Sequence, residues 1–150
     1  MRLTLFTDYC LRVLIYAGLN AERRVTIDEI AERYDISRNH LMKVVFRLGQ
    51  LGYLETVRGK GGGFQLKVDP RQINIGRLVR ETEDDLQIVE CFGENSLCVI
   101  EPACQLRLTL GKALGAFLAV LDQATLDEFL KPRRELMRLL DGPAEPQPAE

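Results

Sequence analysis

The feature that most constrains the fold is a change of hydrophobic period near residue 53. Before it, apolar residues recur every three or four positions, as they do in amphipathic helices. Residues 53–57 and 64–68 instead have the composition of two short strands. Four glycines lie in the connection between them, residues 58–63, and favour a tight turn. We therefore expect a small β-hairpin directly after a helical region.

Capping signals divide that helical region into three helices. Thr7 is expected to cap the first helix, which runs to about residue 20. Thr26 opens a capping box for a second helix over residues 27–34. Ser37 follows a short turn and is expected to cap the third helix. A helix, a helix–turn–helix pair and a hairpin, in this order, predict a winged helix–turn–helix.

The second half of the chain predicts further helices and no further strand. A short helix is expected over residues 75–83, a long one begins near Cys104, and a last one, over about 125–140, restarts at Pro132. The apolar seam of the long helix is too wide for a small monomer to bury alone, which predicts a homodimer. The fold class is therefore mainly α with a β-hairpin wing. Residues 1–70 are expected to form a DNA-binding winged helix–turn–helix domain, and residues 71–104 a connecting helix and the cysteine loop. Dimerisation and C-terminal helices are expected at 105–141, and a disordered tail at 142–150.

Charge is distributed unevenly along the chain and indicates a polyanionic partner. The net charge is −2, yet residues 1–67 carry 11 basic and 7 acidic side chains, a net charge of +4. Within them, residues 33–67 hold 7 basic and 2 acidic side chains. A local positive face of this kind suits double-stranded DNA. No apolar run reaches the roughly 20 residues of a membrane span, and no secretory segment precedes the first helix, so a cytoplasmic protein is expected.

The polar face of the third helix supplies the candidate DNA contacts. Its first turn, where a recognition helix meets base edges, carries Arg38 and Asn39, which can pair with guanine and adenine. Further along the helix, Lys43 and Arg47 suit contacts with DNA phosphates. In the turn of the hairpin, two cationic side chains can approach the DNA backbone or a narrow minor groove. The alternative is the solvated face of a core helix. The candidate DNA-binding residues are Arg38, Asn39, His40, Lys43, Arg47, Arg58 and Lys60.

Catalysis is not expected of this chain. His40 is the single histidine and lies among the DNA-contact candidates, so the side chain most often used in acid–base catalysis is committed elsewhere. The glycine-rich turn also lacks the Lys-Ser/Thr ending of a nucleotide-binding loop, and a strand follows it instead of a helix. We assign no catalytic residue.

Three of the four cysteines lie close together in a segment rich in turn formers. Cys91, Cys98 and Cys104 span 14 residues, whereas Cys10 falls on the apolar face of the first helix and is expected in the core. A disulfide is disfavoured in a reducing compartment. Structural zinc normally uses closely paired cysteines and a fourth Cys or His. An iron–sulfur cluster accepts irregular spacing and is favoured over zinc, but it needs a fourth ligand.

Several of these motifs together resemble a known group of regulators. They are Phe6-Thr7-Asp8-Tyr9, Ser37-x3-Leu41-x-Lys43-Val44-Val45, the wing Val57-Arg58-Gly59-Lys60-Gly61-Gly62-Gly63, and the cysteine triplet. Over roughly residues 1–130 the chain resembles the NsrR group of the iron–sulfur winged-helix family, which also contains IscR. The resemblance implies a homodimeric repressor of an operator, released from DNA when nitric oxide reacts with a cluster, 4Fe–4S or alternatively 2Fe–2S.

The resemblance also implies a ligand set. Cys91, Cys98 and Cys104 would hold the cluster, and Asp8 of the other protomer would complete it. Asp8 has an alternative role at the start of the first helix, where it can pair with Arg12. IscR-like proteins use a histidine three residues after the last cysteine, a position that is Arg107 here. An IscR-like or redox-sensing regulator of the same fold and a zinc-stapled DNA-binding protein are the alternatives.

Overall fold

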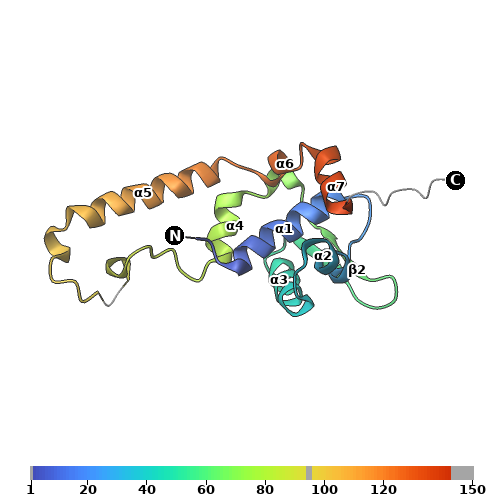
Figure 1. The fold of residues 1–150 in the computed structure, drawn as a ribbon, viewed down its shortest axis with the longest axis horizontal. Helices are drawn as coiled ribbons and strands as arrows, with labels where there is room; N and C mark the ends of the chain where they lie inside the picture. Colours follow the sequence, from blue (N-terminus) through green and yellow to red (C-terminus); the bar gives the residue numbers. More distant parts are fainter. Residues whose placement is uncertain (1, 94–95, 143–150) are drawn as a thin grey trace.

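Helices and a hairpin form a body, from which one long helix extends as an arm (Figure 1). The computed structural model describes residues 2–93 and 96–142. The chain leaves the body after α4, runs outward through an irregular loop and returns along α5 (Figure 1). The elements are α1 (Leu5–Leu19), α2 (Ile27–Tyr34), α3 (Arg38–Gln50), β1 (Leu54–Val57), β2 (Gly63–Leu66), α4 (Ile75–Thr82), α5 (Gln105–Asp122), α6 (Leu126–Phe129) and α7 (Arg133–Asp141), with single 3-10 turns at Pro70–Gln72, Glu90–Phe92 and Glu101–Ala103.

The start of α1 differs from the sequence prediction. Thr4, not Thr7, is the N-cap, and its hydroxyl accepts a hydrogen bond from the Thr7 amide at 3.3 Å. Thr7 is fully buried inside the helix, where its hydroxyl donates to the Thr82 hydroxyl of α4 at 2.9 Å. Thr7 therefore joins α1 to α4 instead of beginning α1. The prediction was wrong because either threonine can cap a helix locally, and only the contact with α4 separates them.

The other elements of the body lie where their capping and turn signals place them. α2 is capped by Thr26, whose side chain accepts from the Glu29 amide, and it ends in the left-handed residue Asp35 with φ 52°. Ser37 occupies the cap position of α3 but makes no side-chain capping bond. The last predicted helix is divided in two, α6 and α7, at Pro132, as expected. The predicted tail lies outside the described residues except for Gly142.

The hairpin is a two-stranded antiparallel sheet in which Leu54 pairs with Leu66 and Val57 with Gly63. Phe64 of β2 also forms a bridge to Val25, through two backbone hydrogen bonds of 2.9 Å. This bridge joins the wing to the segment before α2. Phe64 itself is buried, so the wing is anchored at its base by both packing and backbone bonds.

One hydrophobic core holds the body together. α1 packs against α3, α4 and α6, and α2 packs against α3. The aliphatic side chains expected on the inner faces of α2 and α3, among them Ile30, Leu41 and Leu48, are fully buried. The largest fully buried side chains are Phe64, Leu14, Leu19, Ile30, Leu41, Leu48, Ile73, Leu78, Leu126, Val13, Val25 and Val44.

The base of the arm is fastened to α4 by polar contacts. Asn74 caps α4 and also donates to the Asp122 carbonyl at the end of α5, at 2.6 Å. Arg80 of α4 forms a two-bond ion pair with the Asp122 carboxylate and holds the pKa of that carboxyl below its usual range. No residue of α5 itself is buried. The arm therefore leaves the body with a defined base and an exposed surface.

No helix in the described ranges is long and apolar enough to cross a membrane.

Candidate DNA-binding surface and cysteine site

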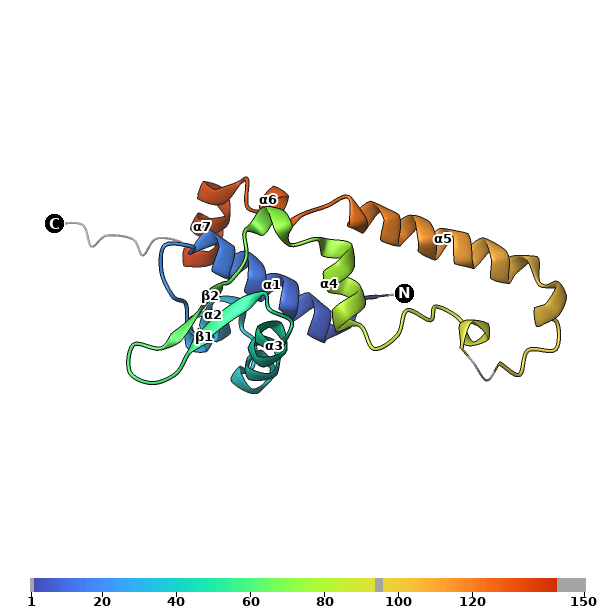
Figure 2. The same ribbon diagram turned by 180° about the vertical axis from the view of Figure 1, so that it is seen from behind.

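Five of the seven side chains predicted to contact DNA lie on the outer face of α3, and all five are exposed. α3 and the tip of the hairpin lie on the same side of the body in both views (Figures 1 and 2). The exposed side chains of α3 are Arg38, Asn39, His40, Lys43 and Arg47. His40 lies beside Tyr9 of α1, with ring centroids 6.1 Å apart. The structure thus presents one polar helical face and a loop next to it, which is the arrangement that a winged helix uses on DNA.

Two of these cations already have protein partners. Arg38 forms an ion pair with Asp28 of α2, and both side chains are more than half exposed. Arg47 donates to the Glu81 carbonyl at the end of α4, at 3.2 Å. A contact from Arg38 to a base must therefore compete with Asp28. Arg47, in turn, connects the candidate DNA face to α4.

The wing presents Arg58 and Lys60 on an exposed turn. Its glycines are required by the backbone, since Gly59 and Gly61 have φ angles of 96° and 76°. A Cβ atom on Gly62 would lie 2.5 Å from the Val57 carbonyl oxygen. The two cations are therefore held on a narrow loop whose other positions exclude side chains or favour glycine.

Sequence analysis missed two apolar residues on the exposed side of α3. Met42 is 46% exposed and Phe46 is 64% exposed. The buried stripe of α3 consists of Leu41, Val44, Val45 and Leu48. Both residues lie outside this stripe, and that position in the helical period could have identified them as exposed. Apolar side chains on a recognition helix can contact thymine methyl groups.

Cys10 is a core residue, as predicted. It is fully buried in α1, and burial raises the pKa of its thiol to about 12. A thiol in this state is unsuited to bind a metal, which requires the thiolate.

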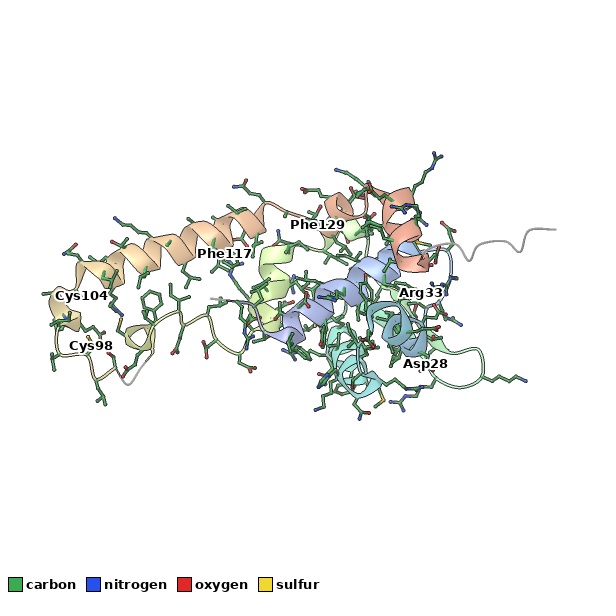
Figure 3. All side chains as sticks on the ribbon, in the orientation of Figure 1. Asp28, Arg33, Cys98, Cys104, Phe117 and Phe129 are labelled. Carbon is green, nitrogen blue, oxygen red and sulfur yellow. The ribbon has the colours of Figure 1, made fainter. Side chains whose placement is uncertain are left out.

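The other three cysteines lie at the far end of the arm. Figure 3 shows Cys98 and Cys104 there, opposite the end of the molecule that carries Asp28. All three thiols are free; Cys98 is exposed, and Cys91 and Cys104 are half-buried. Cys98 and Cys104 line a cavity of about 450 Å³ together with Glu101 and Arg107. Within the ranges 2–93 and 96–142, no three Cys, His, Asp or Glu side chains are gathered around a single ion position.

Arg107 connects the two ends of the cysteine loop, a role that sequence analysis did not assign. Its Nε donates to the Cys91 carbonyl at 3.0 Å, and its backbone amide donates to the Cys104 sulfur at 3.4 Å. Its guanidinium also lies 3.5 Å from the Glu101 carboxylate.

Asp8 lies in the first turn of α1, in the body, and its carboxylate forms an ion pair with Arg12 at 2.8 Å. This is the contact that its alternative role predicts. Within one chain α1 is remote from the tip of the arm (Figure 1). An iron ligand role for Asp8 therefore requires a second protomer.

The donor set at the tip fits an iron–sulfur cluster. Three thiols on one irregular loop suit iron, which is held by thiolates at varied spacing. The cavity beside Cys98 and Cys104 leaves space next to two of them. A four-ligand cluster needs a fourth donor besides these three thiols.

Comparison with known proteins assigns the family. Residues 3–132 match Rrf2, described as an iron-dependent transcriptional regulator. The chain belongs to the Rrf2 family. The HTH-type transcriptional regulator NsrR of Bacillus subtilis (strain 168) is 58% identical to it over 142 residues, covering 93% of this chain and 97% of that protein. The resemblance to the NsrR group is thereby confirmed.

Solved structures of Rrf2-type regulators share the fold. IscR of T. potens has a TM-score of 0.71 at 24% identity and covers 92% of each chain. CymR, the global cysteine regulator of B. subtilis, also has a TM-score of 0.71 at 24% identity, covering 87% of this chain and 97% of its own. The predicted fold class, mainly α with a hairpin wing, is confirmed. This Rrf2 protein is a DNA-binding transcriptional regulator and not an enzyme.

Proposed function

We propose that this Rrf2-family regulator is a homodimeric repressor that senses nitric oxide through an iron–sulfur cluster on Cys91, Cys98 and Cys104. The observation that carries the proposal is a loop with three free thiols at the tip of an arm, in a chain whose body exposes a recognition helix and a wing. Nitric oxide as the signal is what the resemblance to the NsrR group implies, and relatives named NsrR support that resemblance. Arg107, which cannot ligate iron, occupies the position of the IscR-type histidine and argues for the NsrR-type site.

DNA binding is assigned to residues 1–70. Arg38 and Asn39 contact base edges from the first turn of α3, and His40, Lys43 and Arg47 contact the backbone beside them. Arg58 and Lys60 approach the adjacent minor groove or phosphates. Residues 71–104 carry the cluster loop, and residues 105–141 form the dimer.

The three thiolates and a carboxylate make up the ligand set. Cys91, Cys98 and Cys104 of one protomer hold the cluster, and Asp8 of the other completes it, in the 4Fe–4S form. The bound cluster supplies iron to which nitric oxide binds. Asp8 is the weakest ligand of the four, because iron in such clusters prefers thiolate to carboxylate.

Asp8 is the residue that would couple the cluster loop of one protomer to the DNA-binding face of the other, because it would leave the ligand set when the cluster reacts. Its carboxylate then pairs with Arg12, as it does at 2.8 Å in the single chain. The loop of one protomer is thereby disconnected from α1 of the other. Because α1 packs against α3, the spacing of the two recognition helices changes. A palindromic operator requires these helices one DNA turn apart, so affinity falls.

The first test is operator binding by the protein purified without oxygen. Iron and sulfide content and the absorption spectrum establish the cofactor and separate it from zinc. Affinity for the operator is then measured before and after addition of nitric oxide, with the metal-free protein as the reference. We expect tight binding before addition and a large loss after it. An unchanged affinity contradicts the proposal.

The second test separates the two roles of Asp8. If Asp8 is a ligand, Asp8→Ala alters the cluster spectrum and the nitric oxide response, whereas Arg12→Ala leaves the spectrum unchanged. If Asp8 acts only through its ion pair in α1, the two variants behave alike. Identical wild-type spectra in both variants would remove Asp8 from the ligand set.

A further inference from the structure

The cysteine loop is fastened to α5 by contacts that need no cofactor. Its first half, at the Glu90–Phe92 turn, and its last half, at the Glu101–Ala103 turn, both meet the first two turns of α5. Arg107 contacts both halves of the loop. It contacts the carbonyl of Cys91, the sulfur of Cys104 and the carboxylate of Glu101.

Each contact of Arg107 orients a different part of the loop. The bond from Nε to the Cys91 carbonyl, at 3.0 Å, joins residues 16 positions apart and fixes the Cys91 backbone against α5. The bond from the backbone amide to Cys104 Sγ makes this sulfur the N-cap of α5. This bond is made by the main chain, so replacement of the Arg107 side chain leaves it in place. The Glu101 carboxylate, at 3.5 Å, holds the guanidinium in place between them.

A second contact one turn further along α5 completes the attachment. The Phe92 ring lies against Gly111, where an added Cβ atom would be 3.9 Å from its ring edge. Phe92 directly follows Cys91, so the ring and the Arg107 bond fix the same short turn. Together they hold the Cys91–Phe92 turn against α5, beside the cavity lined by Cys98 and Cys104.

We propose that Arg107 is a positioning residue whose side chain ties the Cys91 end of the loop to the start of α5, next to the cavity lined by Cys98 and Cys104, before any cofactor is bound. It does not ligate iron, because a guanidinium has no free lone pair. It restricts the loop so that less ordering remains when the cofactor binds. We call this attachment of the loop by Arg107 the clamp. Its effect on cofactor binding rests on the proposed function, whereas its effect on the metal-free loop does not.

The test uses the full chain with Arg107→Ala, Arg107→Lys and the control Lys112→Gln, which alters an exposed cation one turn and a half further along α5. In the metal-free proteins, hydrogen exchange is measured for peptides covering residues 90–93 and 101–107. We expect exchange to be about tenfold faster in Arg107→Ala. Arg107→Lys keeps the charge but lacks the fork-shaped donor, and is expected to be intermediate. Lys112→Gln and the core peptides of the body remain as in the wild type.

A second measurement follows the loaded protein prepared without oxygen. Loss of iron to a chelator is expected to be about 10- to 100-fold faster in Arg107→Ala, with an altered circular dichroism spectrum of the cluster. Added guanidinium is expected to slow the loss of iron from Arg107→Ala and to leave the rate of the wild type unchanged. A general folding defect does not predict such a rescue.

The outcomes distinguish the two proposals. If the metal-free Arg107→Ala loop exchanges like the wild type, the clamp is wrong, whatever the cofactor. If wild-type protein takes up no iron and sulfide while Arg107→Ala still loosens the loop, the clamp stands and the proposed cofactor is wrong.

Discussion

At the scale of single residues, the cysteines separate by environment more clearly than by spacing. Cys10 is fully buried and its pKa is raised to about 12, because burial disfavours the thiolate. At pH 8 we therefore expect Cys10 in the native metal-free protein to react with iodoacetamide at least about 100-fold more slowly than Cys98. Mass spectrometry of timed samples measures this. In denaturant all four thiols should react alike; fast native labelling of Cys10 contradicts its assignment to the core.

Asp28 is the residue whose removal should strengthen DNA binding. It forms an exposed ion pair with Arg38, on the face proposed to contact DNA. Exposed pairs contribute little to stability, so Asp28→Asn frees Arg38 at small cost. We expect operator affinity to rise by about two- to fivefold. The control is Glu32→Gln, which removes an exposed charge of the same helix; an equal gain there would mean a general charge effect and not release of Arg38.

Residue-level prediction from sequence worked where one local rule decides and failed where a distant contact decides. Cys10 and the inner face of α3 follow from periodicity alone. Thr7 was misassigned because its partner, Thr82, lies 75 positions away. Phe46 was missed because the DNA contacts of this helix were sought only among polar and charged side chains, although it lies outside the apolar stripe.

At the scale of elements, the wing depends on one glycine at its base. Gly63 has φ 144°, and an added Cβ atom would lie 2.5 Å from the Val25 carbonyl oxygen, where Phe64 donates a backbone hydrogen bond. We expect Gly63→Ala to lower the free energy of unfolding by about 1–3 kcal/mol. Gly61→Ala meets nothing within 4 Å and costs only its left-handed φ, about 1 kcal/mol. Urea unfolding compares them, and equal losses contradict a role for the Val25 contact.

The elements themselves were largely predictable, whereas their attachments were not. The period change near residue 53 and the break at Pro132 both correspond to boundaries in the structure. By contrast, Asn74 donates to the Asp122 carbonyl across 48 positions, and Arg107 to the Cys91 carbonyl across 16. Such bonds depend on the direction in which α5 leaves the body, and no local pattern encodes that direction.

At the scale of the whole molecule, α5 is a helix without a core. None of its residues is buried, and Leu106 and Val120 are 64% and 68% exposed. Leu106, Leu110, Ala113, Phe117 and Val120 follow one another at alternating four- and three-residue steps. This is the spacing with which helices pack in pairs, and it runs along the arm away from the body. In the proposed homodimer, a second copy of α5 would cover this seam.

Charges placed in this seam should therefore separate the protomers and weaken DNA binding. We expect the double variant Leu106→Asp, Val120→Asp to sediment as a monomer of 17.0 kDa. The wild type is expected to sediment at twice that mass. Because linked modules gain from effective concentration, operator affinity should fall by about 100-fold or more while each body stays folded. Lys112→Gln also lowers the charge of α5 by one unit and should remain dimeric. A double variant that still dimerises would mean that the protomers associate through another surface, and Asp8 could then not be supplied across a pair of arms.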